Sequence, residues 1–358
     1  MSARRGWCPD IHAPLQAGDG WLLRVKPPFG RMPPAMTDSI CDVASRWGNG
    51  VIEVTSRGNL QLRGIAGSRL DAARACLIAC GAALADPVEE AQRNLAVSPL
   101  AGIDVAVHPA TAWVAETAAA CLRVPGLPPK LGIVVDGGGA FVLGRQAGGV
   151  TLSLRGHVCT IDAHADAPPV LIDALACAIT PRLTVARGEA EPRAEATAPG
   201  LLRHQTGDAL VVTPAFGQTD AAALRLLAGA ATLRLAPARR IVIADGGPAL
   251  LQRARDAGYV TSPDDPRLRT TACAGAPRCA SALQPTHALA ARLAGQIAGH
   301  LHVSGCPKGC GHPVRADVTL VGEEDGYALV RDGRSWDAPV ARSLTADACV
   351  AALRADVR

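Results

Sequence analysis

The stretch from Trp21 to Gly30, WLLRVKPPFG, is matched in pattern by Asp208–Gly217, DALVVTPAFG. Both are short apolar segments that end in Pro-x-Phe-Gly, which predicts a strand followed by a tight turn. A Thr-Asp pair comes next in each case, at positions 37–38 and 219–220. Threonine and aspartate cap helix N-termini, so a helix is expected to start at both places. The repeat indicates two copies of one structural unit.

The correspondence continues beyond these helices. Residues 51–65 and 232–246 each predict a further strand, and the first of them alternates apolar and polar residues with period two. AQRNLAVSP at 91–99 then takes the place of RTTACAGAP at 269–277, and an alanine-rich helix follows each. The order A-B-A′-B′ predicts a duplicated α+β fold.

The composition of the segment between the halves predicts a linker rich in Ala, Pro, Glu and Arg. The expected boundaries are 15–68 and 205–262 for the two A units, 85–185 and 266–345 for the two B units, and 186–204 for the linker.

The composition limits the class of protein. The chain has 358 residues, of which 49% are hydrophobic and 19% charged, as in a folded protein of two or three domains. Its net charge is only +4 and its arginines are scattered, so no nucleic-acid partner is expected. It has neither a long apolar run nor a secretory signal, so the sequence predicts a cytoplasmic protein without a membrane partner.

Four cysteines stand apart from the other eight because they lie in loop-like sequence. Cys273 and Cys279, in TACAGAPRCASA, have five residues between them, and Cys306 and Cys310, in SGCPKGCGHP, have three. Four thiolates can hold a [4Fe–4S] cluster, one on each iron. The surrounding glycines and alanines let the backbone come close to such a cofactor. The pattern therefore predicts four cluster ligands.

Structural zinc and ordinary burial in a core are the two alternatives for these cysteines. Structural zinc usually takes cysteine pairs with two to four residues between them, and the wider first pair does not fit that spacing. Buried core cysteines are common, as Cys76 and Cys80 illustrate, because they have the same three-residue spacing within an alanine-leucine helix. The glycine-lined loops favour the cluster.

The paired cysteine motif, the segment TSRGNLQLRG at 55–64 and the duplicated order resemble the sulfite and nitrite reductases. Within that superfamily the chain is most similar to the precorrin-3B synthase family. The resemblance runs from about Gly20 to Gly322. It implies a sulfite/nitrite reductase-like architecture, with ferredoxin-like half-domains and two α+β domains, one carrying the [4Fe–4S] cluster.

The resemblance also implies functional residues. Arg57, Arg93 and Lys130 match the basic residues that surround the tetrapyrrole and its bound anion, and they are the predicted catalytic residues. Cys310 matches the cysteine that bridges cluster and siroheme in the reductases. Their second catalytic lysine is absent, because Gly132 stands in its place, and this departure favours the synthases.

Residue chemistry supports a binding role for the segment around Arg57. A precorrin carries many carboxylates, and arginine binds carboxylates while keeping its charge. Alternate residues of one strand share a face, so the expected strand would present a polar row that is either a ligand site or a solvated surface. The predicted substrate-binding residues are Arg57, Asn59, Gln61, Arg63, Arg93, Asn94 and Lys130.

The activity that the resemblance implies is conversion of precorrin-3A to precorrin-3B in cobalamin biosynthesis. Dioxygen would hydroxylate a meso carbon, and a neighbouring acetate would close a γ-lactone. The expected electron donor is external, either a reduced pyridine nucleotide acting through a reductase or a ferredoxin. A mononuclear non-haem iron is also implied. The conceivable ligands His108, His300, His302 and His312 form no readable ligand set.

Two alternatives remain at this stage. A siroheme-dependent sulfite or nitrite reductase would contain a bound haem-type cofactor and reduce a small oxyanion. A non-catalytic iron–sulfur electron carrier would have the cluster without a tetrapyrrole pocket, and the polar row around Arg57 speaks against it.

Overall fold

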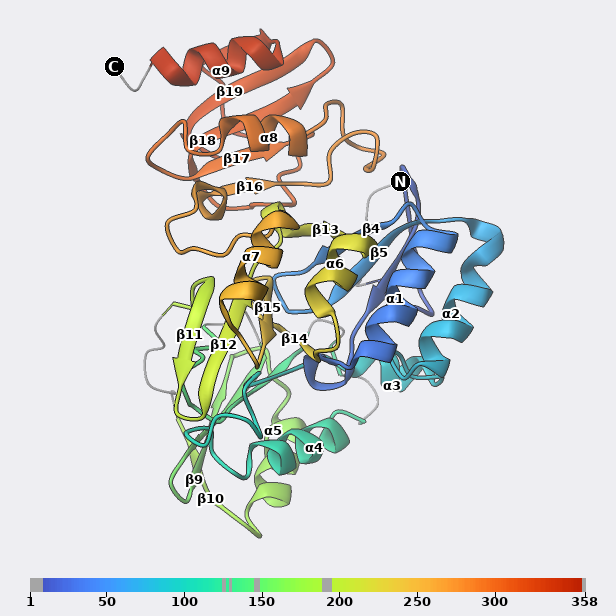
Figure 1. The fold of residues 1–358 in the computed structure, drawn as a ribbon, viewed down its shortest axis with the longest axis vertical. Helices are drawn as coiled ribbons and strands as arrows, with labels where there is room; N and C mark the ends of the chain where they lie inside the picture. The colour runs from blue at the N-terminus through green and yellow to red at the C-terminus, as the bar shows by residue number, and fades with distance from the viewer. Residues whose placement is uncertain (1–8, 124–126, 129–130, 145–148, 189–194, 356–358) are drawn as a thin grey trace. The chain divides into compact units, whose positions relative to one another are not determined.

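The computed structural model describes residues 9–123, 127–128, 131–144, 149–188 and 195–355 (Figure 1). The chain separates into two compact units. The larger unit is Met1–Leu15 with Leu22–Thr261, and the smaller unit is Gln16–Trp21 with Ser262–Arg358. Within the described ranges, no helix is both long and apolar enough to cross a bilayer.

Two five-stranded sheets are built from residues 15–65 and 200–243, and each contributes one strand to the other. Their strand orders are β1-β2-β5-β4-β13 and β11-β12-β15-β14-β3. The exchanged strands are β3 and β13, which pair antiparallel with β14 and β4 respectively. The strands are β1 (Leu15–Ala17), β2 (Gly20–Val25), β3 (Arg31–Met32), β4 (Val51–Val54), β5 (Leu60–Ile65), β11 (Gly200–His204), β12 (Gly207–Val212), β13 (Gln218–Asp220), β14 (Leu233–Ala236) and β15 (Arg240–Ile243).

The exchange follows directly from the repeated Pro-x-Phe-Gly turns. These turns are the short 3₁₀ helices η1 (Pro28–Gly30) and η3 (Ala215–Gly217), and each leads straight into the strand that crosses to the other sheet. Each copy of the repeat therefore completes the sheet of the other, and the duplication seen in the sequence is present in the structure.

The helices of the two copies also correspond. Figure 1 shows α1 (Pro34–Trp47) and α6 (Ala221–Ala228) side by side, with α2 (Leu70–Ala79) packed on α1 and α7 (Pro248–Asp256) packed on α6. The cap predicted for α6 is confirmed, because the Asp220 carboxylate accepts a hydrogen bond from the Ala223 N–H at 2.8 Å. The equivalent cap was wrong for α1, which begins three residues before Thr37 at Pro34, because proline suits the first helical turn.

The prediction of a single strand over residues 51–65 was also wrong. The segment forms a hairpin of β4 and β5, and the turn between them is closed by the Thr55 N–H, which donates to the Asn59 carbonyl at 2.8 Å. Gly58, at φ +74°, supplies the left-handed residue that this turn requires. Arg57 and Asn59 consequently lie in the turn, while Gln61 and Arg63 lie on β5. Residues 232–246 form a second hairpin, β14 with β15.

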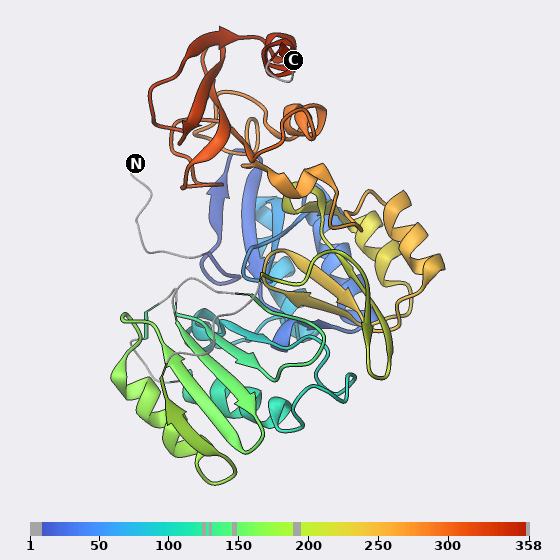
Figure 2. The same ribbon diagram turned by 90° about the vertical axis from the view of Figure 1, so that its left-hand side faces the viewer.

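The remaining sheet of the larger unit has the order β10-β9-β8-β7-β6. Helices α4 and α5 pack on each other and on this sheet, where they bury an apolar core that includes Val114, Leu152 and Leu175 (Figure 2). A short helix, α3, leads into its first strand. The elements are η2 (Gly67–Arg69), α3 (Pro87–Gln92), β6 (Leu95–Val97), α4 (Thr111–Cys121), β7 (Ile133–Asp136), β8 (Val150–Arg155), β9 (Val158–Ala163), α5 (Pro169–Ile179) and β10 (Thr184–Arg187).

The smaller unit contains the fourth sheet, β16-β17-β18-β19-β20, in which the first three strands run parallel. Its elements are η4 (Pro266–Arg269), β16 (Thr270–Ala272), α8 (His287–Leu293), β17 (Leu301–Ser304), β18 (Ala316–Glu323), β19 (Gly326–Gly333), β20 (Ala341–Leu344) and α9 (Ala346–Ala355). The expected linker at 186–204 is not wholly irregular, because β11 lies within it.

Candidate functional site

A basic pocket opens in the larger unit beside the first Pro-x-Phe-Gly turn. The space between its walls, including the part that is open to solvent, is about 890 Å³. The wall comes from η1, the β4–β5 turn, α3 with β6, the end of α4, and Leu235 of β14. Its cationic residues are Lys26, Arg57, Arg93 and Arg123, and its larger apolar ones include Phe29, Leu84, Leu95, Leu122 and Leu235.

Two glycines allow the pocket wall to form. A Cβ atom on Gly30 would lie 2.5 Å from the Leu235 carbonyl oxygen, and one on Gly58 would lie 2.9 Å from the Ala236 carbonyl carbon. The turn and the hairpin can therefore rest directly on the backbone of β14 only because these side chains are absent. Phe29, which directly precedes Gly30, has the left-handed φ of 53°, a strained conformation for a bulky residue. It also lines the pocket.

Arg93 is largely enclosed by its neighbours in the pocket. Its Nη2 donates to the Glu90 carboxylate at 2.8 Å and to the Ala82 carbonyl at 3.0 Å. The Arg93 side chain is 15% exposed and that of Glu90 is fully buried. Burial lowers the pKa of Arg93 and raises that of Glu90, while their mutual attraction opposes both shifts. The Nε and Nη1 atoms of Arg93 are buried without a hydrogen-bond partner.

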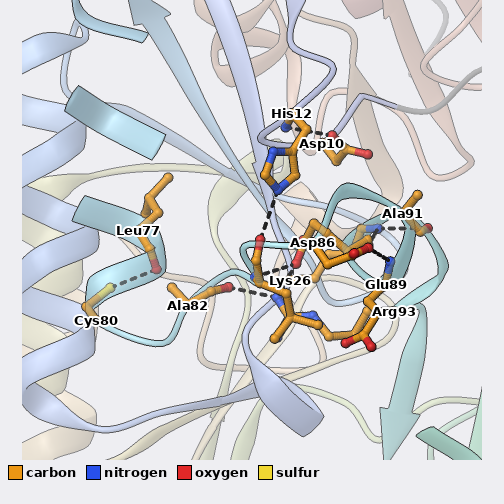
Figure 3. A network of polar contacts seen from close by, with 12 residues as sticks. Asp10, His12, Lys26, Leu77, Cys80, Ala82, Asp86, Glu89, Ala91 and Arg93 are labelled. Carbon is orange, nitrogen blue, oxygen red and sulfur yellow. Dashed lines mark hydrogen bonds and ion pairs between the residues drawn. The ribbon is translucent and has the colours of Figure 1, made fainter. Parts of the chain in front are cut away.

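Lys26 lies in the same network, directly after β2. Its ammonium donates to the carbonyl oxygens of Glu90 at 2.6 Å and Ala91 at 3.1 Å (Figure 3). The residue is only 4% exposed, and burial lowers the pKa of its amine despite the attraction of Glu90. Burying a charged lysine costs free energy of folding unless an anion or hydrogen-bond acceptors compensate its charge.

The structure brings three of the predicted site residues to the pocket, namely Arg57, Asn59 and Arg93. Asn94 is not among the described residues that line it. Lys130 lies outside the described residues, so its predicted role stays a prediction.

Gln61 and Arg63 are not among the described residues that line this pocket, and their role in binding stays a prediction. Arg63 is 4% exposed and its Nη1 lies 3.5 Å from the Glu53 carboxylate. With its amide oriented to suit both neighbours, Gln61 donates to Glu53 and accepts from Arg24, each at 2.8 Å. These side chains form an internal polar network on the sheet rather than a wall of the pocket.

Sequence reasoning missed Lys26 and Arg123. Arg123 follows α4 and its Nε lies 3.6 Å from the Glu89 carboxylate, which also lines the pocket. The only signal for Lys26 is a charged residue between an apolar strand and a proline pair, and neither residue shows its role before the chain is folded.

The four predicted cluster cysteines lie together in the smaller unit. β16 and β17 are parallel neighbours, with Ala272 paired to Val303, so the loops carrying Cys273 and Cys306 begin at the same edge of the sheet. The Gly305 N–H donates to the Cys273 sulfur at 3.1 Å. Gly311 passes so close that a Cβ atom there would lie 3.1 Å from the Cys273 Cβ.

The thiols also affect one another electrostatically. Burial raises the pKa of Cys273, two backbone N–H groups lower it, and Cys306 and Cys279 raise it. Burial raises the pKa of Cys310 as well, and the same three cysteines add to that shift. The four thiols come from two loops and lie close enough to affect one another's pKa, and a backbone N–H donates to one of the sulfurs. This arrangement fits the ligand chemistry of a [4Fe–4S] cluster.

A single metal ion is a different case. In the described part of the chain, no group of three or more His, Cys, Asp or Glu side chains is arranged around one ion. This does not count against a cluster, because each cysteine of a cube binds a different iron and the sulfurs remain farther apart.

The histidines were conceivable ligands for a mononuclear iron. His300 and His312 stack with ring centroids 4.4 Å apart, and Thr271 Oγ1 lies 2.9 Å from His302 Nδ1 and 3.1 Å from His300 Nε2. His108 is elsewhere, in the larger unit, where its Nε2 lies 2.7 Å from the Gly156 carbonyl oxygen. Within the described residues, these histidines belong to no group of three or more His, Cys, Asp or Glu side chains that could hold one ion.

Comparisons with known proteins agree on the fold. Residues 14–80 match the nitrite/sulfite reductase ferredoxin-like half domain. The NirA protein of Mycobacterium tuberculosis superposes with a TM-score of 0.66 over 94% of this chain and 80% of its own, at 17% identity. The predicted α+β, sulfite/nitrite reductase-like architecture is thus confirmed. A precorrin-3B synthase from Sinorhizobium sp is 33% identical over 95% of this chain and 85% of its own length.

Proposed function

Because the chain belongs to the precorrin-3B synthase family, we propose that it converts precorrin-3A to precorrin-3B with dioxygen. The observation that supports this most directly is the basic pocket, which combines four cationic side chains with an apolar wall. A precorrin has the matching chemistry, since its macrocycle is largely apolar and its side chains end in carboxylates. An electron carrier has no use for such a pocket.

In this proposal the pocket binds and orients the tetrapyrrole. Arg57, Arg93 and Lys26 hold carboxylates, and charge-assisted hydrogen bonds of this kind are about twice as strong as neutral ones. Phe29, Leu122 and Leu235 contact the macrocycle and keep water from that part of it. Lys130 is proposed to add a further cation.

The overall reaction balances as a monooxygenation. One oxygen atom of dioxygen enters the meso position, and the other leaves as water, reduced by two electrons from an external donor and two protons. The acetate oxygen then bonds to the adjacent ring carbon as the double bond at that carbon opens, and the carboxyl proton moves to the atom that takes up the electron pair, so the γ-lactone closes without loss of further atoms. When bound by Cys273, Cys279, Cys306 and Cys310, a [4Fe–4S] cluster would supply one-electron transfer.

Orientation is the main contribution of the pocket to lactone closure. A carboxylate held beside its target carbon reacts as an intramolecular group, and effective molarities for well-oriented pairs reach about 10⁵ M or more. The residues that fix the carboxylates thereby decide which acetate can reach the ring.

The experiment is turnover of precorrin-3A by the anaerobically purified protein with its metal content intact, a chemical reductant and isotopically labelled dioxygen. We expect a product that has gained one labelled oxygen atom and contains a lactone by mass spectrometry and NMR. Absence of this product from protein with a full cluster would refute the proposal.

Extraction of tetrapyrroles from the same sample tests the main alternative. Stoichiometric siroheme together with sulfite or nitrite reduction would make the protein a reductase instead. Gly132, in place of the second catalytic lysine, supports the synthase, because that lysine provides charge and protons for a small oxyanion.

A further inference from the structure

We propose that Lys26 and Arg93 jointly bind one carboxylate of the ligand, and that Glu90 is the positioning residue that holds Arg93 ready for it. This inference rests on the proposed function, in which the ligand is a tetrapyrrole with several acid side chains. It places Lys26 and Arg93 on the same carboxylate and adds one acid that acts only through its neighbour.

The balance of buried charge is the first argument. Four charged groups act on the Lys26 ammonium: Arg24 and Arg93 are positive, and Glu90 and Asp10 are negative. With Lys26 itself, three positive charges face two negative ones. An excess positive charge away from water is unfavourable, and an anion in the adjoining pocket would neutralise it.

Unused hydrogen-bond donors are the second argument. Arg93 has two buried nitrogens, Nε and Nη1, without a partner, although a buried donor of a charged group is costly when it makes no hydrogen bond. The Lys26 ammonium donates to two carbonyl oxygens and has three N–H bonds. Both residues line the pocket, but the two Arg93 nitrogens are covered by other atoms, so a ligand carboxylate reaches them only by displacing that cover and then meets donors already desolvated.

The rigidity of the segment that carries Arg93 is the third argument. Helix α3 is fixed at its start by Asp86, whose carboxylate accepts from the Val88 and Glu89 N–H groups at 2.8 and 2.9 Å. At its end, Lys26 binds the carbonyls of Glu90 and Ala91. Figure 3 shows Asp86, Glu89, Lys26 and Ala91 of this network close to Arg93.

Glu90 then fixes the guanidinium itself. One oxygen of its buried carboxylate, Oε2, accepts both from Arg93 Nη2 at 2.8 Å and from the Leu84 N–H at 2.9 Å. The Leu84 carbonyl oxygen lies 2.9 Å from His12 Nε2, and this contact fixes the loop around Leu84 that binds Glu90. Arg93 is thereby kept in one orientation, which reduces the entropy lost when it binds a ligand.

The test uses uroporphyrin I as a stable polycarboxylate probe, and its octamethyl ester as the matched ligand without charge. Binding is followed by fluorescence titration with the full-length protein. We expect Lys26→Met and Arg93→Ala each to weaken uroporphyrin binding about 10-fold or more, as for a lost hydrogen bond to a charged group, and to leave ester binding unchanged. Glu116→Gln, an exposed acid of α4 that does not line the pocket, is the control and should leave uroporphyrin binding unchanged.

A double-mutant cycle separates positioning from direct contact. Glu90→Gln should weaken uroporphyrin binding in the native background and have no further effect when Arg93→Ala is already present. Equal effects in both backgrounds would overturn the role of Glu90. Circular dichroism and thermal unfolding establish that each variant is folded.

Lys26→Gln keeps the proposal testable if Lys26→Met does not fold, because the glutamine amide can still donate to the α3 carbonyls. It should lose uroporphyrin affinity like the methionine variant, and unchanged affinity would overturn the role of Lys26. The two proposals also fail separately. If the Lys26 variants convert precorrin-3A as well as the native protein does, this inference alone is overturned. If uroporphyrin binding depends on Lys26 but the native protein does not convert precorrin-3A, only the proposed function is overturned.

Discussion

Phe29 and Phe216 have the same left-handed backbone conformation, with φ of 53° and 55°, at equivalent places in the two copies of the repeat. Each precedes a glycine and the strand that crosses to the opposite sheet. A bulky residue at positive φ is unfavourable, so its presence in both copies means that the turn is fixed by its surroundings. Only the first copy opens into the basic pocket, where Phe29 forms part of the wall.

The glycines after these phenylalanines should respond differently to substitution. Gly30→Ala places a Cβ atom 2.5 Å from the Leu235 backbone oxygen, whereas Gly217→Ala places it 2.6 Å from the Arg239 side chain, which can move. Both glycines have positive φ, so each substitution costs about 1–2 kcal/mol from the backbone alone. Denaturant unfolding should show the larger loss of stability for Gly30→Ala. Equal losses would contradict the close packing on Leu235.

Cysteines of identical spacing should differ in their effect on iron content. Cys310→Ser should remove most acid-labile sulfide and iron, because it replaces a proposed cluster ligand. Cys80→Ser is the matched control, since Cys80 ends a Cys-x3-Cys pair at the end of α2 and should leave iron and sulfide unchanged. Full iron and sulfide in the Cys310 variant would remove that residue from the ligand set.

Arg57 and Arg63 should separate binding from stability. Arg57→Ala should weaken binding of the tetrapyrrole about 10- to 100-fold at constant stability, because the side chain lines the pocket. Arg63→Ala should instead lower the free energy of unfolding by a few kcal/mol (about 2–4), since it removes an ion-pair partner of Glu53 at a largely buried site. Titration and denaturant unfolding of both variants check this, and a stability loss in Arg57→Ala alone would reverse the assignment.

His302 should make stability depend on pH. Burial beside His312 lowers its pKa from 6.5 to about 4. Since the unfolded chain takes up the proton first, the stabilising contribution is complete above pH 6.5 and is lost as the pH falls toward 4. Between about pH 7.5 and about pH 5 the loss should be about 2 kcal/mol.

Urea unfolding at these two pH values measures the effect of His302. His302→Gln keeps a polar group near Thr271 but does not titrate, so its stability should vary less over this range. The same pH dependence in the variant would assign the effect to another group.

Local chemistry made much of the fold predictable. The Pro-x-Phe-Gly repeat predicted the duplication, because a turn of fixed conformation needs the same residues each time it occurs. The loop context of Cys273 and Cys306 distinguished them from Cys76, which lies in a helix. In each case the signal comes from residues that are neighbours in the chain.

Alternation of residue types was an incomplete guide. It suggested a single strand through Arg57, but Gly58 at positive φ and the Thr55–Asn59 hydrogen bonds turn the chain back. Alternation also did not reveal that Arg63 forms an ion pair with Glu53 on the adjacent strand. Alternation reports which residues share a face and does not report what that face meets.

The sequence by itself determined the duplicated α+β order. It also singled out the four loop cysteines as cluster ligands and the arginines of the first half as ligand-binding candidates, because these predictions depend on residue type and spacing along the chain. Only the tertiary structure decided which basic residues share a pocket. Lys26, Arg93 and Arg123 come from three separate segments, and they line one pocket because β14 supports η1 while α3 and α4 complete the wall. Their charges interact through space, and that distance is set by packing rather than by position in the chain.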